Sequence, residues 1–168
     1  MDPREIKLSN LLVNYSCRVQ PGEKVLIDYE GSECRNLVKQ LIRDVYAAGG
    51  YPYVNIRDSA VNRDLMMGCT EESLKFQRDY QLHQMKGMDA YIAIRGTENA
   101  FELADVPSEK HAVWDRAYED VLNYRVDKTK WVILRYPNAA MAQLAETSID
   151  SFADFFYDVC TLDYGKMS

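Results

Sequence analysis

The chain has 168 residues, of which 47% are hydrophobic and 27% charged, and this length predicts one domain with enough core to need no disulfide. Its 20 Lys and Arg and 26 Asp and Glu give a formal net charge of −6, which argues against a general binder of nucleic acid or anionic membranes. No apolar run approaches the ~20 residues of a membrane span, and no apolar segment follows the charged start MDPREIK. With four widely spaced cysteines, we therefore expect a cytoplasmic protein with reduced thiols.

Helical and strand patterns alternate from the start of the chain. A helix is expected over 2–15, and a Pro-Gly turn then leads to a strand over 24–30. Ser32 is expected to cap a second helix, which ends at Gly49 because a glycine there allows a left-handed cap. The next strand is expected over 51–58.

The rest of the chain continues the same alternation. Its elements are expected in this order: helix 62–67, a helix capped by Thr70, strand 89–96, helix 108–122, strand 130–137, a helix from Asn138 and a helix capped by Ser148. Strands that alternate with helices are typical of a parallel sheet covered on both faces. We therefore predict an α/β fold of three layers, flavodoxin-like or Rossmann-like, with a mostly parallel sheet of about four or five strands.

The predicted strands share a polar ending. Their apolar runs stop at Asp28, Arg57, Arg95 and Arg135. Ligands of parallel α/β sheets bind outside the carboxyl ends of the strands, and arginines there suit a carboxylate, which a guanidinium grips with two hydrogen bonds. An alternative interpretation is structural. The nearby acids are Asp28, Glu30, Asp58 and Glu98, and they offer the arginines partners for an ion-pair network, or the arginines dock another domain.

Motifs that carry catalysis are absent from the sequence. There is no H-E-x-x-H metal site, no G-x-S-x-G nucleophile turn and no glycine-rich phosphate loop. The two histidines, His83 and His111, fall on or beside apolar helical stripes, where packed and hydrogen-bonded histidines are expected. The residues therefore indicate an α/β domain without a catalytic apparatus or cofactor of its own.

Five segments, taken as an ordered set, are more specific than any single motif. They are LLVNYSCRVQPGEKVLID, AAGGYPYVNIRDSAVNRDLM, MDAYIAIRGTENAFELADVP, TKWVILRYPNAAMAQLA and DFFYDVCTLDYGKMS. Together they resemble the amino-terminal domain of the aminopeptidase T/aminopeptidase S family, the thermophilic metalloprotease family. The resemblance runs essentially from end to end of the chain.

This resemblance implies a metal-dependent aminopeptidase, which removes amino-terminal residues from peptides with two divalent ions of zinc or cobalt type. In that family the metal ligands lie in a carboxy-terminal catalytic domain, to which nothing here corresponds, so no catalytic or metal-binding residue is assigned. Residues 1–168 are then a single α/β domain that packs against the missing domain, helps to enclose the peptide substrate, and is inactive alone. The residues expected to line the substrate cavity are Arg57, Arg95, Glu98, Asn99, Arg135 and Tyr136.

Two alternatives belong to other functional classes. The chain is interpreted either as a stand-alone flavodoxin-like module that holds a small anionic ligand at the Arg-lined sheet edge, or as a self-association module. In the second alternative the apolar last helix forms a homodimer. None of the three interpretations involves nucleic acid or a membrane.

Overall fold

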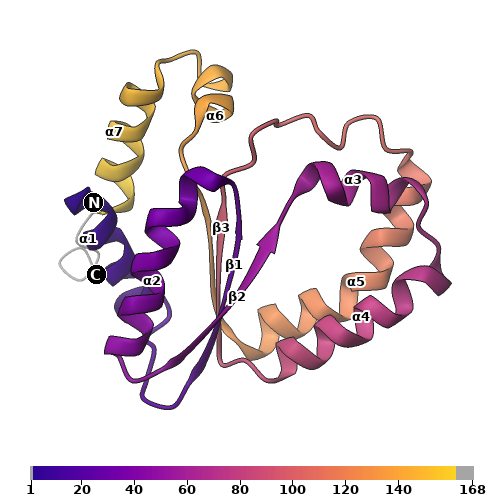
Figure 1. The fold of residues 1–168 in the computed structure, drawn as a ribbon, viewed down its shortest axis with the longest axis horizontal. Coiled ribbons are helices and arrows are strands. Elements are labelled where there is room, and N and C mark those ends of the chain that lie inside the picture. Colours follow the sequence, from indigo (N-terminus) through magenta and orange to yellow (C-terminus); the bar gives the residue numbers. More distant parts are fainter. Residues whose placement is uncertain (1, 162–168) are drawn as a thin grey trace.

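The computed structural model describes residues 2–161. Its centre is a sheet in which all three strand pairs are parallel, as predicted (Figure 1). The strands are β1 (Lys24–Glu30), β2 (Tyr51–Arg57), β3 (Ala90–Arg95) and β4 (Lys130–Arg135), in the order β2-β1-β3-β4. This order matches the first four strands of flavodoxin-like folds and places a topological switch point between β1 and β3. The predicted α/β class is confirmed.

One face of the sheet carries the larger core. The covering elements are α1 (Pro3–Leu11), a π-helical turn (Leu12–Ser16), α2 (Arg35–Ala47) and α7 (Ile149–Cys160). Ile27 and Ile92 of the two central strands meet Leu8 and Leu41 of these helices, and all four are fully buried. Each such side chain contributes roughly 1.5–3 kcal/mol of hydrophobic stabilisation, so this face contributes more of it than the face with the smaller core.

The opposite face is covered only in part. Helices α4 (Glu71–Lys86) and α5 (Ser108–Lys128) pack on each other, and Met85 and Val121 near their carboxyl ends join Leu26 and Tyr91 in a smaller core. Figure 1 shows this helix pair running away from the sheet, with α3 (Ser59–Met67) near its far end. A cavity lies between this face of the sheet and the three helices.

Most predicted helix starts are confirmed by their caps. Thr70 forms a capping box with Ser73, and the side chains of Asn138 and Ser148 accept backbone N–H groups of α6 (Ala139–Leu144) and α7. The cap predicted at Ser32 is wrong. Residues Ser32–Cys34 form a 3-10 turn without a side-chain cap, because Gly31 already turns the chain out of β1.

The predicted end of α5 at residue 122 is also wrong. The helix continues to Lys128, since Tyr124 packs against the smaller core and Arg125 stacks on Tyr91. These tertiary contacts stabilise two more helical turns that the local pattern did not require. No helix within residues 2–161 is both long and apolar enough to span a membrane.

A buried carboxylate joins three elements of the larger core. Glu5 of α1 accepts hydrogen bonds from the hydroxyls of Tyr136, which follows β4, and Tyr157 of α7. Burial is the main cause that raises the pKa of both phenols, and hydrogen bonding to Glu5 raises it further. The pKa of Tyr157 reaches about 12. The Arg4 guanidinium lies 4.5 Å from the centre of the Tyr157 ring. The chain start, β4 and α7 are therefore held by one polar cluster.

The loops after β1 and β3 cross at two glycines. Gly31 has φ +102°, and a Cβ built on it would lie 2.3 Å from the carbonyl oxygen of Gly96. Only glycine permits both this backbone conformation and this approach. The crossing brings the carboxyl ends of the two central strands together at the switch point.

We predict that Gly31→Ala lowers the free energy of unfolding by about 2 kcal/mol or more, because alanine meets both a strained φ and a backbone clash. Urea unfolding followed by circular dichroism measures the loss. The matched control is Gly68→Ala, at which an added Cβ meets nothing within 4 Å. Equal stabilities for the two variants would contradict the close crossing.

We also predict an alkaline loss of stability to which Tyr157 contributes. Unfolded tyrosine ionises near pH 10, whereas folded Tyr157 keeps its proton to about pH 12. Its stabilising contribution is thus complete below pH 10 and is lost between pH 10 and 12. Urea unfolding at pH 9, 10 and 11 should show a shallower decline for Tyr157→Phe than for the unmodified chain. Tyr46→Phe, at a residue 62% exposed, serves as the control, and an equally shallow decline there would refute the assignment.

Candidate functional site

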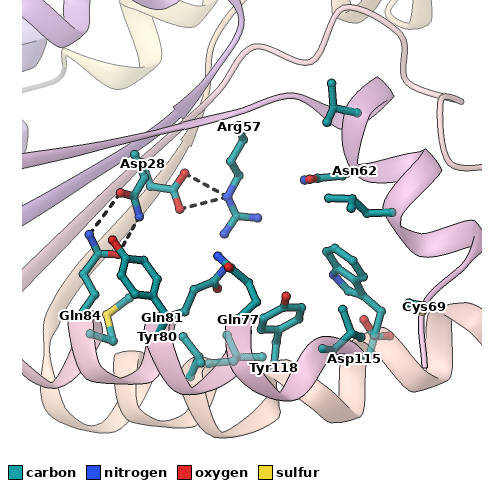
Figure 2. A pocket seen from close by; sticks show the side chains of 18 of the residues that line it. Asp28, Arg57, Asn62, Cys69, Gln77, Tyr80, Gln81, Gln84, Asp115 and Tyr118 are labelled. Atoms are coloured by element: carbon teal, nitrogen blue, oxygen red, sulfur yellow. Dashed lines mark hydrogen bonds and ion pairs between the residues drawn. The ribbon is translucent and has the colours of Figure 1, made fainter. Parts of the chain in front are cut away.

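A cavity of about 1630 Å³ lies between the partly covered face of the sheet and helices α3, α4 and α5. Figure 2 shows Arg57 reaching into it from β2, opposite Gln77 and Gln81 of α4. Asn62 of α3 and Tyr118 of α5 line other sides. The cavity exists because α4 and α5 contact the sheet only near their carboxyl ends.

Asp28 is the centre of the polar wall of this cavity. It lies at the middle of β1, is 3% exposed, and accepts the Nε–H of Arg57 on both carboxylate oxygens at 3.0 Å. The Tyr91 hydroxyl donates to it at 3.0 Å. Arg95 donates to the Asp28 backbone oxygen at 3.1 Å, to its carboxylate at 3.4 Å, and to the Tyr91 hydroxyl at 3.1 Å. A single buried carboxylate thus orders two arginines and a tyrosine.

These contacts shift the titration of the groups around Asp28. Burial disfavours the charged guanidinium of Arg57, but the charge and hydrogen bond of Asp28, together with Tyr91 and Glu30, outweigh it and raise the pKa of Arg57. Burial and the Asp28 charge also raise the pKa of Tyr91, which therefore stays a neutral hydrogen-bond donor. The alternative of an ion-pair network is confirmed for Arg57 and Arg95.

Arg125 belongs to the same cluster but has a different environment. Its guanidinium carbon lies 3.9 Å from the centre of the Tyr91 ring, a cation–π geometry. Its Nε is buried and has no hydrogen-bond partner among the described residues. Burial, with smaller contributions from the charges of Arg57 and Arg95, lowers the pKa of Arg125. Arg125 therefore has a buried donor that no described residue satisfies.

A second, smaller cavity of about 470 Å³ lies at the carboxyl ends of the strands. Its buried carboxylate is Glu30, which accepts the backbone N–H of Ser59 and the Thr97 hydroxyl. Glu98 and Asn99 line its outer side on the loop after β3. Arg57 lines both cavities, so the two adjoin at the end of β2.

The family model of the thermophilic metalloprotease (M29) family matches residues 1–166. The chain belongs to this family. Membership confirms the resemblance given by the five ordered segments, and the family is metal-dependent, as its description states. No curated protein gave a significant match to the chain.

The family fold is also seen in a solved relative. Wild-type AmpT from Thermus thermophilus is similar over 94% of this chain, with a TM-score of 0.70 and 19% identity. The match spans only 42% of the AmpT chain, so this chain corresponds to less than half of that protein.

Two further structures have weaker similarity. They are the CurK enoyl reductase (TM-score 0.36, 12% identity, 95% of this chain and 51% of that one) and an alcohol dehydrogenase superfamily protein from Novosphingobium aromaticivorans (TM-score 0.34, 14% identity, 96% and 49%). Such scores are too low to bear on the fold or the function.

The described residues offer no suitable donor set for the metal that the family requires. Within residues 2–161, no group of three or more His, Cys, Asp or Glu side chains is arranged to hold an ion. His111 is half-buried and lies 3.3 Å from the Leu103 carbonyl oxygen, as expected of a packed histidine. The packed position predicted for His83 is wrong, because that side chain is exposed on α4.

The six predicted cavity residues occupy four places. Arg57 and Arg95 meet at Asp28, and Glu98 and Asn99 line the smaller cavity. Arg135 is exposed on β4. Tyr136 lies in the larger core on the opposite face, bonded to Glu5. Their contact with a substrate stays a prediction.

Sequence reasoning missed Arg125 as a residue of the cavity. A signal was present, because Tyr118, Val121 and Arg125 follow one another at helical spacing on the inner side of α5. An arginine in line with an apolar stripe is unusual and marks a special environment. Ending the helix at residue 122 removed Arg125 from consideration.

We predict that Asp28→Asn lowers the free energy of unfolding by roughly 1–3 kcal/mol, because it leaves the arginines without their carboxylate. The loss falls below that of a fully buried pair, since the Arg57 side chain is 39% exposed. A double-mutant cycle with Arg57→Met, measured by urea unfolding, should give an interaction energy of about 1 kcal/mol.

The matched control for this cycle is Asp154→Asn, which removes a carboxylate that is 69% exposed in its ion pair with Arg4. Its effect should stay within about 0.5 kcal/mol, as is usual for exposed ion pairs. Strict additivity of Asp28→Asn and Arg57→Met would contradict the role given to Asp28.

Proposed function

We propose that the chain is the amino-terminal, cavity-shaping part of a metal-dependent aminopeptidase that removes amino-terminal residues from peptides. The observation that carries the proposal is the family match over residues 1–166, together with similarity to AmpT over 94% of this chain. The 42% share of AmpT supports a second, larger part of the protein as the partner of this domain.

Hydrolysis belongs, in this proposal, to polypeptide outside this chain. Residues 2–161 offer no donor set for the ions of zinc or cobalt type that the resemblance implies. Their contribution is to bind, position and exclude water from a peptide. The 168-residue chain alone is therefore proposed to be inactive.

The residues proposed to face the peptide are the polar groups at the carboxyl edge of the sheet. Glu98 and Asn99 stand on an exposed loop beside the smaller cavity, and Arg57 and Arg95 are fixed by Asp28. Arg135 extends this edge at β4. Tyr136 does not contact the peptide in this proposal. Its hydrogen bond to buried Glu5 instead fixes the position of the chain that follows β4.

The family match favours the aminopeptidase domain over the alternative of a stand-alone module. One part of it, the binding of a small anion by the arginines, has separate support in the geometry of Arg125. The expected homodimer through the last helix stays a prediction.

The test compares the 168-residue chain with a chimera that joins it to the part of AmpT beyond the matched region. With Zn²⁺ or Co²⁺ added, the chimera should release p-nitroaniline from leucine p-nitroanilide and the chain alone should not.

Within the chimera, Glu98→Gln should raise KM with little change in kcat, as expected for loss of a binding contact. The control is Arg43→Met, on α2 at the opposite face.

Circular dichroism shows whether the chain and the chimera are folded in this comparison. Metal-dependent hydrolysis by the isolated, folded chain would refute the proposal. So would a folded chimera that binds metal and hydrolyses no aminoacyl anilide.

A further inference from the structure

Around Asp28, the larger cavity brings together more guanidinium groups than carboxylates. Three guanidinium groups, of Arg57, Arg95 and Arg125, surround the single buried carboxylate of Asp28. Four acids also line the cavity, namely Asp58, Asp64, Asp115 and Glu119. Among the described residues none of these four forms an ion pair with the three arginines. Asp28 is thus the one carboxylate among the described residues that forms ion pairs with these arginines, and it does so with Arg57 and Arg95.

The buried Nε–H of Arg125 has no hydrogen-bond acceptor among the described residues. Its Nε is buried and unbonded within the described part of the chain, and its guanidinium makes no ion pair there. Buried donors in folded proteins are nearly always satisfied, because desolvation without a hydrogen bond is costly. Arg57 donates only its Nε–H to Asp28, and its two terminal nitrogens make no hydrogen bond within residues 2–161. The terminal nitrogens of Arg125 likewise make no hydrogen bond among the described residues, so both side chains offer terminal N–H groups to an incoming anion.

The shape of the donors selects the class of anion. A guanidinium presents a planar fork that matches a planar carboxylate, and stacking on Tyr91 fixes the plane of the Arg125 fork. The opposite wall offers the side-chain amides of Gln77 and Gln81, which make no hydrogen bond among the described residues (Figure 2). Amides suit the N–H and C=O groups of a peptide. A cavity of about 1630 Å³ has room for a short peptide.

We propose that Arg125 and Arg57 bind the terminal carboxylate of a short peptide in the cavity between the sheet and helices α3, α4 and α5. Tyr91 and Asp28 hold the two guanidinium groups in place, and Gln77 and Gln81 contact the peptide groups. The site binds and orients its ligand without reacting with it. The choice of a peptide rests on the proposed function, whereas the carboxylate site rests on the arginines alone.

The test is isothermal titration calorimetry of the 168-residue chain with trialanine, trialanine amide and acetate. Trialanine should bind, and the amide should bind at least about tenfold more weakly, because it lacks the charge that the guanidinium groups recognise. Acetate should bind more weakly than trialanine, since it cannot reach the glutamines. Arg125→Met should weaken trialanine binding by about tenfold or more, whereas Arg43→Met, the same change on the opposite face, should leave it unchanged.

Arg57→Met is a second variant, which keeps the test valid if Arg125→Met fails to fold by circular dichroism. Failure of trialanine and acetate to bind would overturn the carboxylate site. Equal binding of trialanine and its amide would show that the carboxylate is not recognised. Equal binding of acetate and trialanine would overturn the peptide as ligand. These titrations need no metal and no hydrolysis, so their outcome is distinct from that of the chimera.

Discussion

The arrangement of the cavity depends on one buried carboxylate, Asp28. A charge at the middle of a central strand is tolerated only when it is paired and hydrogen-bonded, and Asp28 meets this requirement through Arg57, Arg95 and Tyr91. The same bonds hold the Tyr91 ring on which Arg125 lies. The need to satisfy a single charge therefore orders Arg57 and Arg95 and, through Tyr91, the position of Arg125.

The two faces of the sheet are packed differently. The face under α1, α2 and α7 is closed and mostly apolar, and a polar cluster around Glu5 joins the chain start to the elements after β4. The other face keeps a smaller core and leaves a cavity beneath α4 and α5. Stability is concentrated on one side, which leaves the other side free to hold charged groups that cost stability.

This division fits a domain that works as part of a larger protein. The fold matches 42% of the AmpT chain, and the described residues bring polar side chains together without a metal donor set. In the function that we propose, this domain contributes walls, charges and exclusion of water to a site whose reactive groups lie on other polypeptide. The exposed loop with Glu98 and Asn99 stands at the carboxyl edge, where parallel α/β domains meet their ligands.

The sequence by itself determined the local structure and the family. The apolar runs of β1 and β3 and the caps at Thr70, Asn138 and Ser148 depend on neighbouring residues, so the pattern alone predicted them. The alternation of a strand also decides which residues can share a site, because successive side chains point to opposite faces of the sheet. Arg135 and Tyr136 therefore could not share a face, and Tyr136 lies in the core with Glu5.

Only the tertiary structure decided the strand order, the extension of α5 and the meeting of Arg57, Arg95 and Arg125 at one carboxylate. Asp28 and Arg57 are 29 residues apart, and Tyr91 and Arg125 are in separate elements. Their contacts follow from how the strands are ordered and how α5 is rotated on the sheet. That rotation is set by the packing of Val121 and Tyr124 against Leu26 and Tyr91, long-range contacts that no local pattern encodes.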